Sequence, residues 1–124
     1  MIKKIIASLL LTVSVSIIIP SEASAMWKQD KYGNNFWIEN GVKSKGWKKI
    51  NGEWYYFRND GAMIAQWIMD NGNWYYFWTN GTMASNCWLK NNGLWYYFDE
   101  NGKMVTDYVT IGDKRYDFTA RTFI

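Results

Sequence analysis

The stretch NGEWYYFRNDG, residues 51–61, places four aromatic residues in a row between two turn-forming pairs. It returns as NGNWYYFWTNG at 71–81 and as NGLWYYFDENG at 92–102. The Asn-Gly pair that opens each stretch suits a two-residue type I′ turn, because both turn positions need a positive φ. We therefore predict hairpins that turn at residues 51–52, 71–72 and 92–93, with Gly112-Asp113 at the equivalent place near the C-terminus.

These stretches belong to a repeat of about 20 residues. A leading aromatic residue recurs at intervals of 20, 20, 21 and 20 residues, and the extra residue lies between Met83 and Trp88. Such self-similarity is typical of stacked arrays, in which each unit buries its apolar face against its neighbours. The leading aromatics Trp27, Trp47, Trp67, Trp88 and Tyr108 define the units 27–46, 47–66, 67–87, 88–107 and 108–124.

The first and last units are degenerate. In the first, the WYYF block aligns with residues 34–37, NNFW, and Lys43 stands at the position of a repeated Met. In the last, the block becomes residues 115–118, RYDF. Changes of this kind are expected at the ends of an array, because the outermost unit meets solvent on one face.

The expected register divides each WYYF block between the two faces of its hairpin. With a two-residue turn, Trp47 pairs with Tyr56 and shares one face with Trp54. Tyr55 and Phe57 lie on the other face, so we expect one set to pack and the other to bind. An isolated hairpin is marginal in water, and consecutive hairpins must therefore stack. The predicted fold class is an all-β solenoid of stacked β-hairpins, about five units long, with degenerate ends.

The composition restricts the chemistry of the chain. It has no histidine, which excludes histidine-based triads, acid–base relays and most zinc sites. Carboxylates such as Asp60, Asp99 and Glu100 lie beside turns, without the shaped cleft that glycoside hydrolysis needs. A formal net charge of +3 is too even to indicate nucleic-acid binding. We predict no catalytic residue, no metal and no cofactor, and we expect the single cysteine, Cys87, to be a small buried residue at the position of Gly46.

Residues 1–25 have the features of a secretory signal peptide. A basic start, MIKK, precedes an apolar run at 5–19 that is too short to span a bilayer comfortably. Ala23-Ser24-Ala25 then provides a cleavage site of small residues before Met26. We expect a secreted chain that does not span the membrane once the signal is removed.

The aromatic face of each hairpin also suggests a ligand. Trp47 and Trp54, closed by Tyr76 of the next hairpin, would place three ring faces around a small space. Quaternary ammonium groups bind in such boxes, because ring quadrupoles attract their diffuse charge. The same rings could instead only pack between units or offer a surface on which sugars stack. The next unit would repeat the arrangement with Trp67, Trp74 and Tyr97.

Residues 46–66, GWKKINGEWYYFRNDGAMIAQ, resemble a choline-binding repeat, also called a cell-wall-binding repeat. Residues 66–86 and 87–107 are similar to the same unit, and both ends match it weakly. The resemblance implies hairpins wound into a left-handed superhelix, with choline from wall teichoic acids held between neighbouring hairpins by Trp and Tyr, often beside Met. It thus implies a non-catalytic module at the cell wall.

Carried onto this sequence, the resemblance implies two complete choline sites and two incomplete ones. Related glucan-binding repeats have similar sequences, so a glucan is the alternative ligand, and choline-linked pairing of two copies is left open. At the first interface Asn34 replaces the second Trp beside Trp27. The first complete site would comprise Trp47, Trp54, Tyr76 and Met63, the second Trp67, Trp74, Tyr97 and Met83, and the further incomplete site Trp88, Trp95, Met104 and Asp117, with Asp117 in place of a Tyr.

Overall fold

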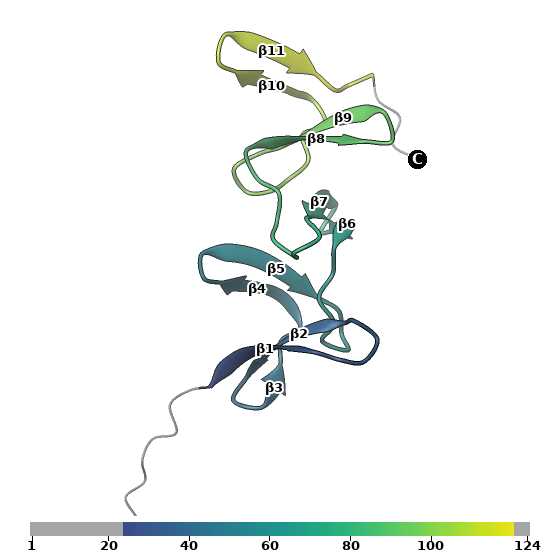
Figure 1. The fold of residues 1–124 in the computed structure, drawn as a ribbon. Helices are drawn as coiled ribbons and strands as arrows, with labels where there is room; N and C mark the ends of the chain where they lie inside the picture. The colour runs from purple at the N-terminus through teal and green to yellow at the C-terminus, as the bar shows by residue number, and fades with distance from the viewer. Residues whose placement is uncertain (1–23, 121–124) are drawn as a thin grey trace, which may run out of the picture.

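The structure is a computed structural model that describes residues 24–120, and all of its regular elements are strands. Figure 1 shows five hairpins stacked along one axis, from β1–β2 at one end to β10–β11 at the other. The predicted all-β stack of hairpins is confirmed, whereas the expectations about residues 1–23 lie outside the described residues. The strands are β1 (Ala25–Gln29), β2 (Asn35–Glu39), β3 (Val42–Lys43), β4 (Gly46–Ile50), β5 (Glu53–Phe57), β6 (Gln66–Asp70), β7 (Asn73–Phe77), β8 (Cys87–Asn91), β9 (Leu94–Phe98), β10 (Tyr108–Ile111) and β11 (Lys114–Asp117).

The register of the hairpins follows from their turns. In β4–β5, Trp47 lies opposite Tyr56, and the same pairing recurs in β6–β7 and β8–β9. Asn51 has a φ of 50° and Gly52 a φ of 83°, the two left-handed conformations that a type I′ turn requires. The predicted turns at 51–52, 71–72, 92–93 and 112–113 are confirmed.

The turn of the first hairpin is longer than the two-residue turns of the hairpins that follow. Gln29 pairs with Asn35, so residues 30–34 connect β1 to β2. The Asp30 carboxylate closes this loop by accepting hydrogen bonds from the backbone N–H groups of Tyr32 and Asn34. The repeated block is therefore displaced by one residue, and Asn35, not Asn34, occupies the position of the second Trp.

After each of the hairpins β4–β5, β6–β7 and β8–β9, one methionine forms an isolated β-bridge with its own hairpin and a backbone hydrogen bond to the preceding hairpin. Phe57 pairs with Met63 across the turn at residues 58–62, and the Met63 N–H donates to the carbonyl of Asn35 at 2.8 Å. Each connection thus joins two consecutive units through the backbone. The equivalent bonds run from Met83 to Trp54 at 2.9 Å and from Met104 to Trp74 at 2.8 Å.

The extra residue of the third unit is absorbed in the connection, as expected. Asn86 adopts a φ of 48° there, and β8–β9 keeps its register. Cys87 lies opposite Phe98, where the preceding unit has Gln66, so a small side chain is not required at this position. The thiol is half-buried against the core, and burial raises its pKa.

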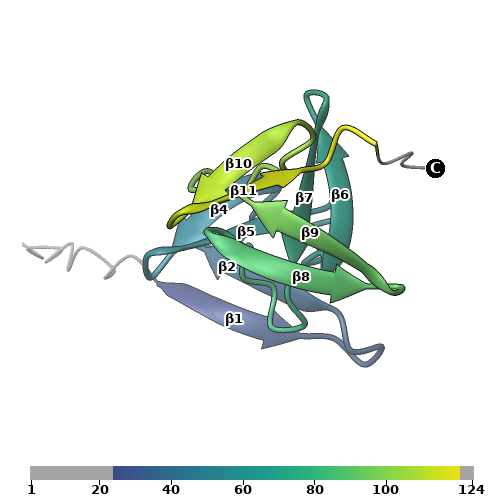
Figure 2. The same ribbon diagram turned by 90° about the horizontal axis from the view of Figure 1, so that it is seen from above.

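The hairpins stack with the leading-Trp face of one against the opposite face of the next. Seen along the axis, β10–β11 lies above β4–β5 and β8–β9 above β1–β2, with β6–β7 on a third side (Figure 2). The core is correspondingly a column of rings between hairpins. Its centre is formed by the phenylalanines that end the repeated blocks, Phe57, Phe77 and Phe98, which are at most 1% exposed.

The close approach of Met63 to Gly81 predicts a difference between two glycine variants. Both Gly81 and Gly72 have a φ near +80°, at 88° and 79°, so alanine is strained at either position by about 1 kcal/mol. A Cβ at residue 81 would also collide with the sulfur of Met63, whereas a Cβ at residue 72 would meet nothing within 4 Å. We expect Gly72→Ala to lower the free energy of unfolding by about 1 kcal/mol and Gly81→Ala by about 2–4 kcal/mol. Urea denaturation measures both, and equal losses would contradict this packing.

Candidate functional site

Each interface between hairpins inserts a leading Trp between two rings of the next hairpin. The Trp47 ring centroid lies 4.7 Å from that of Tyr75 and 5.6 Å from that of Phe77. Trp54 stands edge-on to Trp47 at 6.2 Å and leaves a space beside it. The four interfaces define box 1 (Trp27, Asn35, Tyr55, Met63), box 2 (Trp47, Trp54, Tyr75, Met83), box 3 (Trp67, Trp74, Tyr96, Met104) and box 4 (Trp88, Trp95, Tyr116).

The geometry repeats closely from box 2 to box 4. The leading Trp lies 4.9 Å from Tyr96 in box 3 and 4.8 Å from Tyr116 in box 4. The second Trp stands 6.2 Å from the first in all three, at angles of 85° to 89°. Equal geometry at each interface follows from equal residues at equal positions in a head-to-tail array.

The tyrosines that close the boxes are not those expected from the sequence. Tyr75 lies against Trp47, whereas Tyr76 faces the other way and packs on Trp67 at 5.2 Å. Tyr97 likewise packs on Trp88 at 5.1 Å. The reason is the direction of stacking, because one face of a hairpin meets the opposite face of the next. Both faces of the WYYF block therefore contribute to every interface.

The methionines are displaced by one unit from their expected boxes. Met63 lines box 1 and Met83 lines box 2, because each connection reaches back to the preceding hairpin. Met104, expected beside Trp88, packs instead in the core cluster with Trp67 and Trp74. No signal within a single repeat gives these assignments, because they depend on the preceding hairpin to which each connection bonds.

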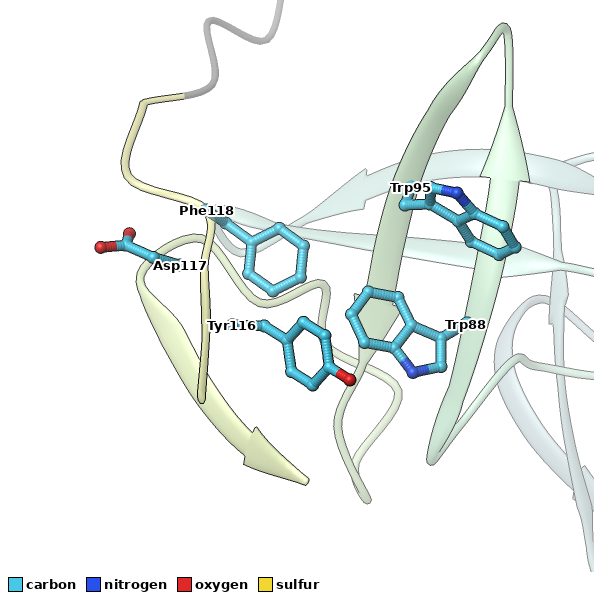
Figure 3. Close-up of a pocket in the computed structure, with 5 residues that line it drawn as sticks. All are labelled: Trp88, Trp95, Tyr116, Asp117 and Phe118. Atoms are coloured by element: carbon cyan, nitrogen blue, oxygen red, sulfur yellow. The ribbon is translucent and has the colours of Figure 1, made fainter. Parts of the chain in front are cut away.

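Box 4 is more complete than the sequence indicated. Trp88, Trp95, Tyr116, Asp117 and Phe118 line a hollow of about 490 Å³. Figure 3 shows the two indoles and the rings of Tyr116 and Phe118 grouped together, with the Asp117 carboxylate turned away from them. That carboxylate accepts hydrogen bonds from the hydroxyl and N–H of Thr119, at 2.7 and 2.9 Å, which lower its pKa. Tyr116 thus takes the position in box 4 at which Asp117 was expected from the sequence.

Boxes 1 and 2 differ in their walls. Box 1 encloses about 240 Å³, with Trp27 5.0 Å from Tyr55 and Asn35 in place of the second Trp. Box 2 encloses about 290 Å³ and has Glu100 and Asn101 at its edge. Box 1 therefore offers one ring fewer, and box 2 adds a carboxylate.

Box 2 also has a polar support behind its rings. The indole N–H of Trp47 donates to a carboxylate oxygen of Asp70 in the next hairpin, at 2.9 Å. This bond fixes the ring plane of the leading Trp across the interface. Burial first, and then the charges of Asp70 and Asp99, raise the pKa of the Tyr75 hydroxyl. Box 2 thus combines apolar rings with negative charge, which suits a cation.

Other kinds of site are not found in the part of the chain that the structure describes. Between residues 24 and 120, no three His, Cys, Asp or Glu side chains gather in a way that could hold a metal ion. Within the same range, no helix has the length and apolar character needed to cross a membrane. The aromatic boxes are therefore the sites on which a function can be argued.

Comparison with known proteins identifies the repeats. The family described as choline-binding repeat matches residues 44–88, and the putative cell wall binding repeat matches residues 88–104. The chain belongs to the choline-binding repeat family. Boxes 2 and 3 have both tryptophans within these matched choline-binding repeats, whereas the closing hairpin of box 4 lies beyond them.

Solved structures share this arrangement of choline-binding repeats. Choline-binding protein F from Streptococcus pneumoniae is 33% identical, with a TM-score of 0.69 over 77% of this chain and 33% of that one. The multimodular pneumococcal cell wall endolysin from phage Cp-1, complexed with choline, is 38% identical, with a TM-score of 0.62 over 72% of this chain and 27% of that one. The chain thus spans a third or less of the length of these relatives. No curated protein matches it.

The raised pKa of Tyr75 predicts a loss of stability at alkaline pH. Because the neutral phenol is favoured in the folded state, its contribution is complete below the unfolded pKa of about 10 and is lost as the pH rises through the folded value. We expect the free energy of unfolding to fall above about pH 10, and to fall less steeply in Tyr75→Phe. Urea denaturation between about pH 8 and pH 11.5 measures the slope.

The control for this experiment is Tyr32→Phe, which makes the same chemical change on a ring that is 78% exposed. It is expected to keep the wild-type dependence on pH. If the free energy of unfolding of Tyr75→Phe fell as steeply above about pH 10 as that of the wild type, the Tyr75 hydroxyl would not be the cause of the alkaline loss of stability.

Proposed function

We propose that the chain is a secreted, non-catalytic binding module that attaches to the bacterial cell wall by holding choline groups of teichoic acids in boxes 1–4. The observation that carries this proposal is the recurrence of two Trp and one Tyr at the same distances in boxes 2, 3 and 4. A trimethylammonium group fits such a box, because several ring faces attract its diffuse charge and its methyl groups leave water.

Exposure of the second Trp favours binding over packing alone. A ring that only filled the core would be buried, as Phe77 and Phe98 are at 0% exposure. Trp54 and Trp95 instead remain 40% and 50% exposed at the openings of boxes 2 and 4. Large apolar rings exposed at these two equivalent positions indicate an interaction surface, and the equivalent Trp74 of box 3 is half-buried.

The relatives support both the ligand and the location. The phage Cp-1 endolysin was solved with choline, and choline-binding protein F in the presence of a peptidoglycan analogue. The similar part is the repeat region, about a third or less of each relative. We infer that this chain supplies binding and not the lytic chemistry of an endolysin.

Several weak boxes on one stack suit a polymeric ligand. Each ring contributes about 0.5–2 kcal/mol to holding a cation, so a single box binds weakly. Successive boxes on a rigid array can engage successive choline groups, and the second binding event then profits from a high effective concentration. Attachment to a choline-bearing wall would therefore be much tighter than the binding of free choline.

Calorimetric titration distinguishes a cation box from a sugar-stacking surface. Choline is expected to bind, and the uncharged isostere 3,3-dimethylbutanol is expected to bind far more weakly, because ring quadrupoles attract only the charged group. Equal affinity for the two compounds would refute the cation-box mechanism. Binding of dextran fragments without binding of choline would establish the glucan alternative.

Replacement of Trp54 by Leu is expected to weaken one box. The variant keeps an apolar side chain in box 2 but removes a ring face, so choline should bind there with about 0.5–2 kcal/mol less free energy, a loss of roughly two- to thirtyfold. Box 3 should keep its affinity, since it shares no ring with Trp54. Calorimetry or NMR titration of the indole N–H signals would separate the boxes.

The matched control is Trp78→Leu, which removes an indole that packs on Tyr76 at 5.4 Å and lines no part of box 2. It should leave the affinity of box 2 unchanged. Equal loss of box 2 affinity in both variants would mean that Trp54 acts only through the general stability of the stack.

A further inference from the structure

Each end of the stack presents half of a box. At the N-terminal end, Phe36 occupies the position that Tyr55 and Tyr75 hold in boxes 1 and 2, because it lies one place before the Trp37 that pairs with Trp27. It faces away from the second hairpin. At the C-terminal end, Tyr108 occupies the position of the leading Trp and faces away from the fourth hairpin. Each half-box has the rings of one hairpin and no neighbour to complete it within the described residues.

A basic side chain of the chain itself lies on the ring of each half-box. The Lys43 ammonium is 4.1 Å from the Phe36 ring centroid, and the Arg115 guanidinium is 4.0 Å from that of Tyr108. These cation-to-centroid distances are much shorter than those of Lys49 to Trp54, 5.9 Å, and of Lys90 to Trp95, 5.8 Å. A cation at this distance from a ring face is in the favourable range.

The two basic residues stand where the internal units carry box residues. Lys43 occupies the position of Met63, and its side chain packs on Gly61 as Met63 packs on Gly81. Arg115 lies opposite Thr110 as Trp54 lies opposite Lys49, so it replaces the second Trp of a box. Both ends have therefore exchanged an apolar wall for a cation.

The exchange is confined to the outward faces. On the last hairpin the inward rings are kept, with Tyr116 and Phe118 at 4.8 and 5.9 Å from Trp88. On the first hairpin the inward face keeps Trp27 at 5.2 Å from Trp37, and the second Trp is replaced there by the uncharged Asn35. A general loss of the repeat pattern would not by itself place a cation on the ring of each outward face.

We propose that Lys43 and Arg115 are built-in cations that fill the terminal half-boxes and prevent a second copy of the chain from stacking end to end. The leading-Trp face of one hairpin is complementary to the opposite face of the next, so two bare ends would join. Such a contact is heterologous and does not close, and copies would add without limit.

The cations oppose this contact in two ways. A head-to-tail pair would bring Arg115 of one copy and Lys43 of the other together beside only one carboxylate, that of Asp117, which lies opposite Tyr108 on the same face. The contact would keep an excess of positive charge, and like charges in contact are unfavourable. The same pair would also place two cations where an internal box has room for one. The proposal rests on the geometry of the boxes, and it holds whether or not choline is the ligand that the internal boxes bind.

The test restores the internal residues at both ends in the double variant Lys43→Met/Arg115→Trp. Sedimentation velocity without choline, over a hundredfold range of protein concentration, should show the mean mass of this variant rising severalfold while that of the wild type stays constant. The control Lys103→Met/Lys114→Trp introduces the same two residues and removes the same two positive charges at exposed positions that lie on neither half-box. It should sediment as the wild type does.

A mixture of the two single variants gives a sharper outcome and disturbs each copy less. Lys43→Met frees only one end and Arg115→Trp only the other, so each alone should remain like the wild type. Mixed in equal amounts, they should form a pair of twice the monomer mass and grow no further, because both outer ends still carry a cation. A mixture that sediments like its separate components, or a control variant that associates as strongly as the double variant, would overturn the proposal.

Discussion

The structure depends on one contact, the insertion of each leading Trp between a Tyr and a Phe of the next hairpin. The Trp–Tyr separation is 5.0, 4.7, 4.9 and 4.8 Å at the four successive interfaces. A two-stranded hairpin cannot bury enough surface to be stable alone, so these contacts supply the core that each unit lacks. The backbone bonds from Met63, Met83 and Met104 to the preceding hairpin then hold the units at a fixed spacing.

The same rings supply both the core and the boxes. Trp47 is inserted against Tyr75 on one side and leaves an open space beside Trp54 on the other. A ligand in that space would touch two hairpins at once and would bind only the stacked state. Binding and folding are therefore linked, and occupancy of the boxes should stabilise the array by mass action.

Local features of the fold could be predicted from the sequence because local chemistry determines them. The Asn-Gly pairs require left-handed backbone conformations, which fixed the type I′ turns and, through them, the register of Trp47 opposite Tyr56. The turn of the first hairpin could not be predicted in this way, because it contains no Asn-Gly pair. Its longer loop is closed instead by hydrogen bonds to the Asp30 side chain.

The composition of the boxes could not be predicted from one hairpin. The error concerned Tyr76, which shares a face with Trp74 in its own hairpin but does not meet Trp47. Which residue lies across an interface depends on the direction of stacking, a long-range property that the pattern of a single unit does not contain. The assumption that one face packs and the other binds was wrong for the same reason, since every interface is built from both faces.

The most direct test of this account is a crystal structure of the chain grown with saturating choline. The account predicts a trimethylammonium group in box 2, within about 6 Å of the ring centroids of Trp47, Trp54 and Tyr75, and an equivalent group in box 3. Empty boxes under these conditions, or choline bound only to rings on the outer surface of the stack, would contradict it.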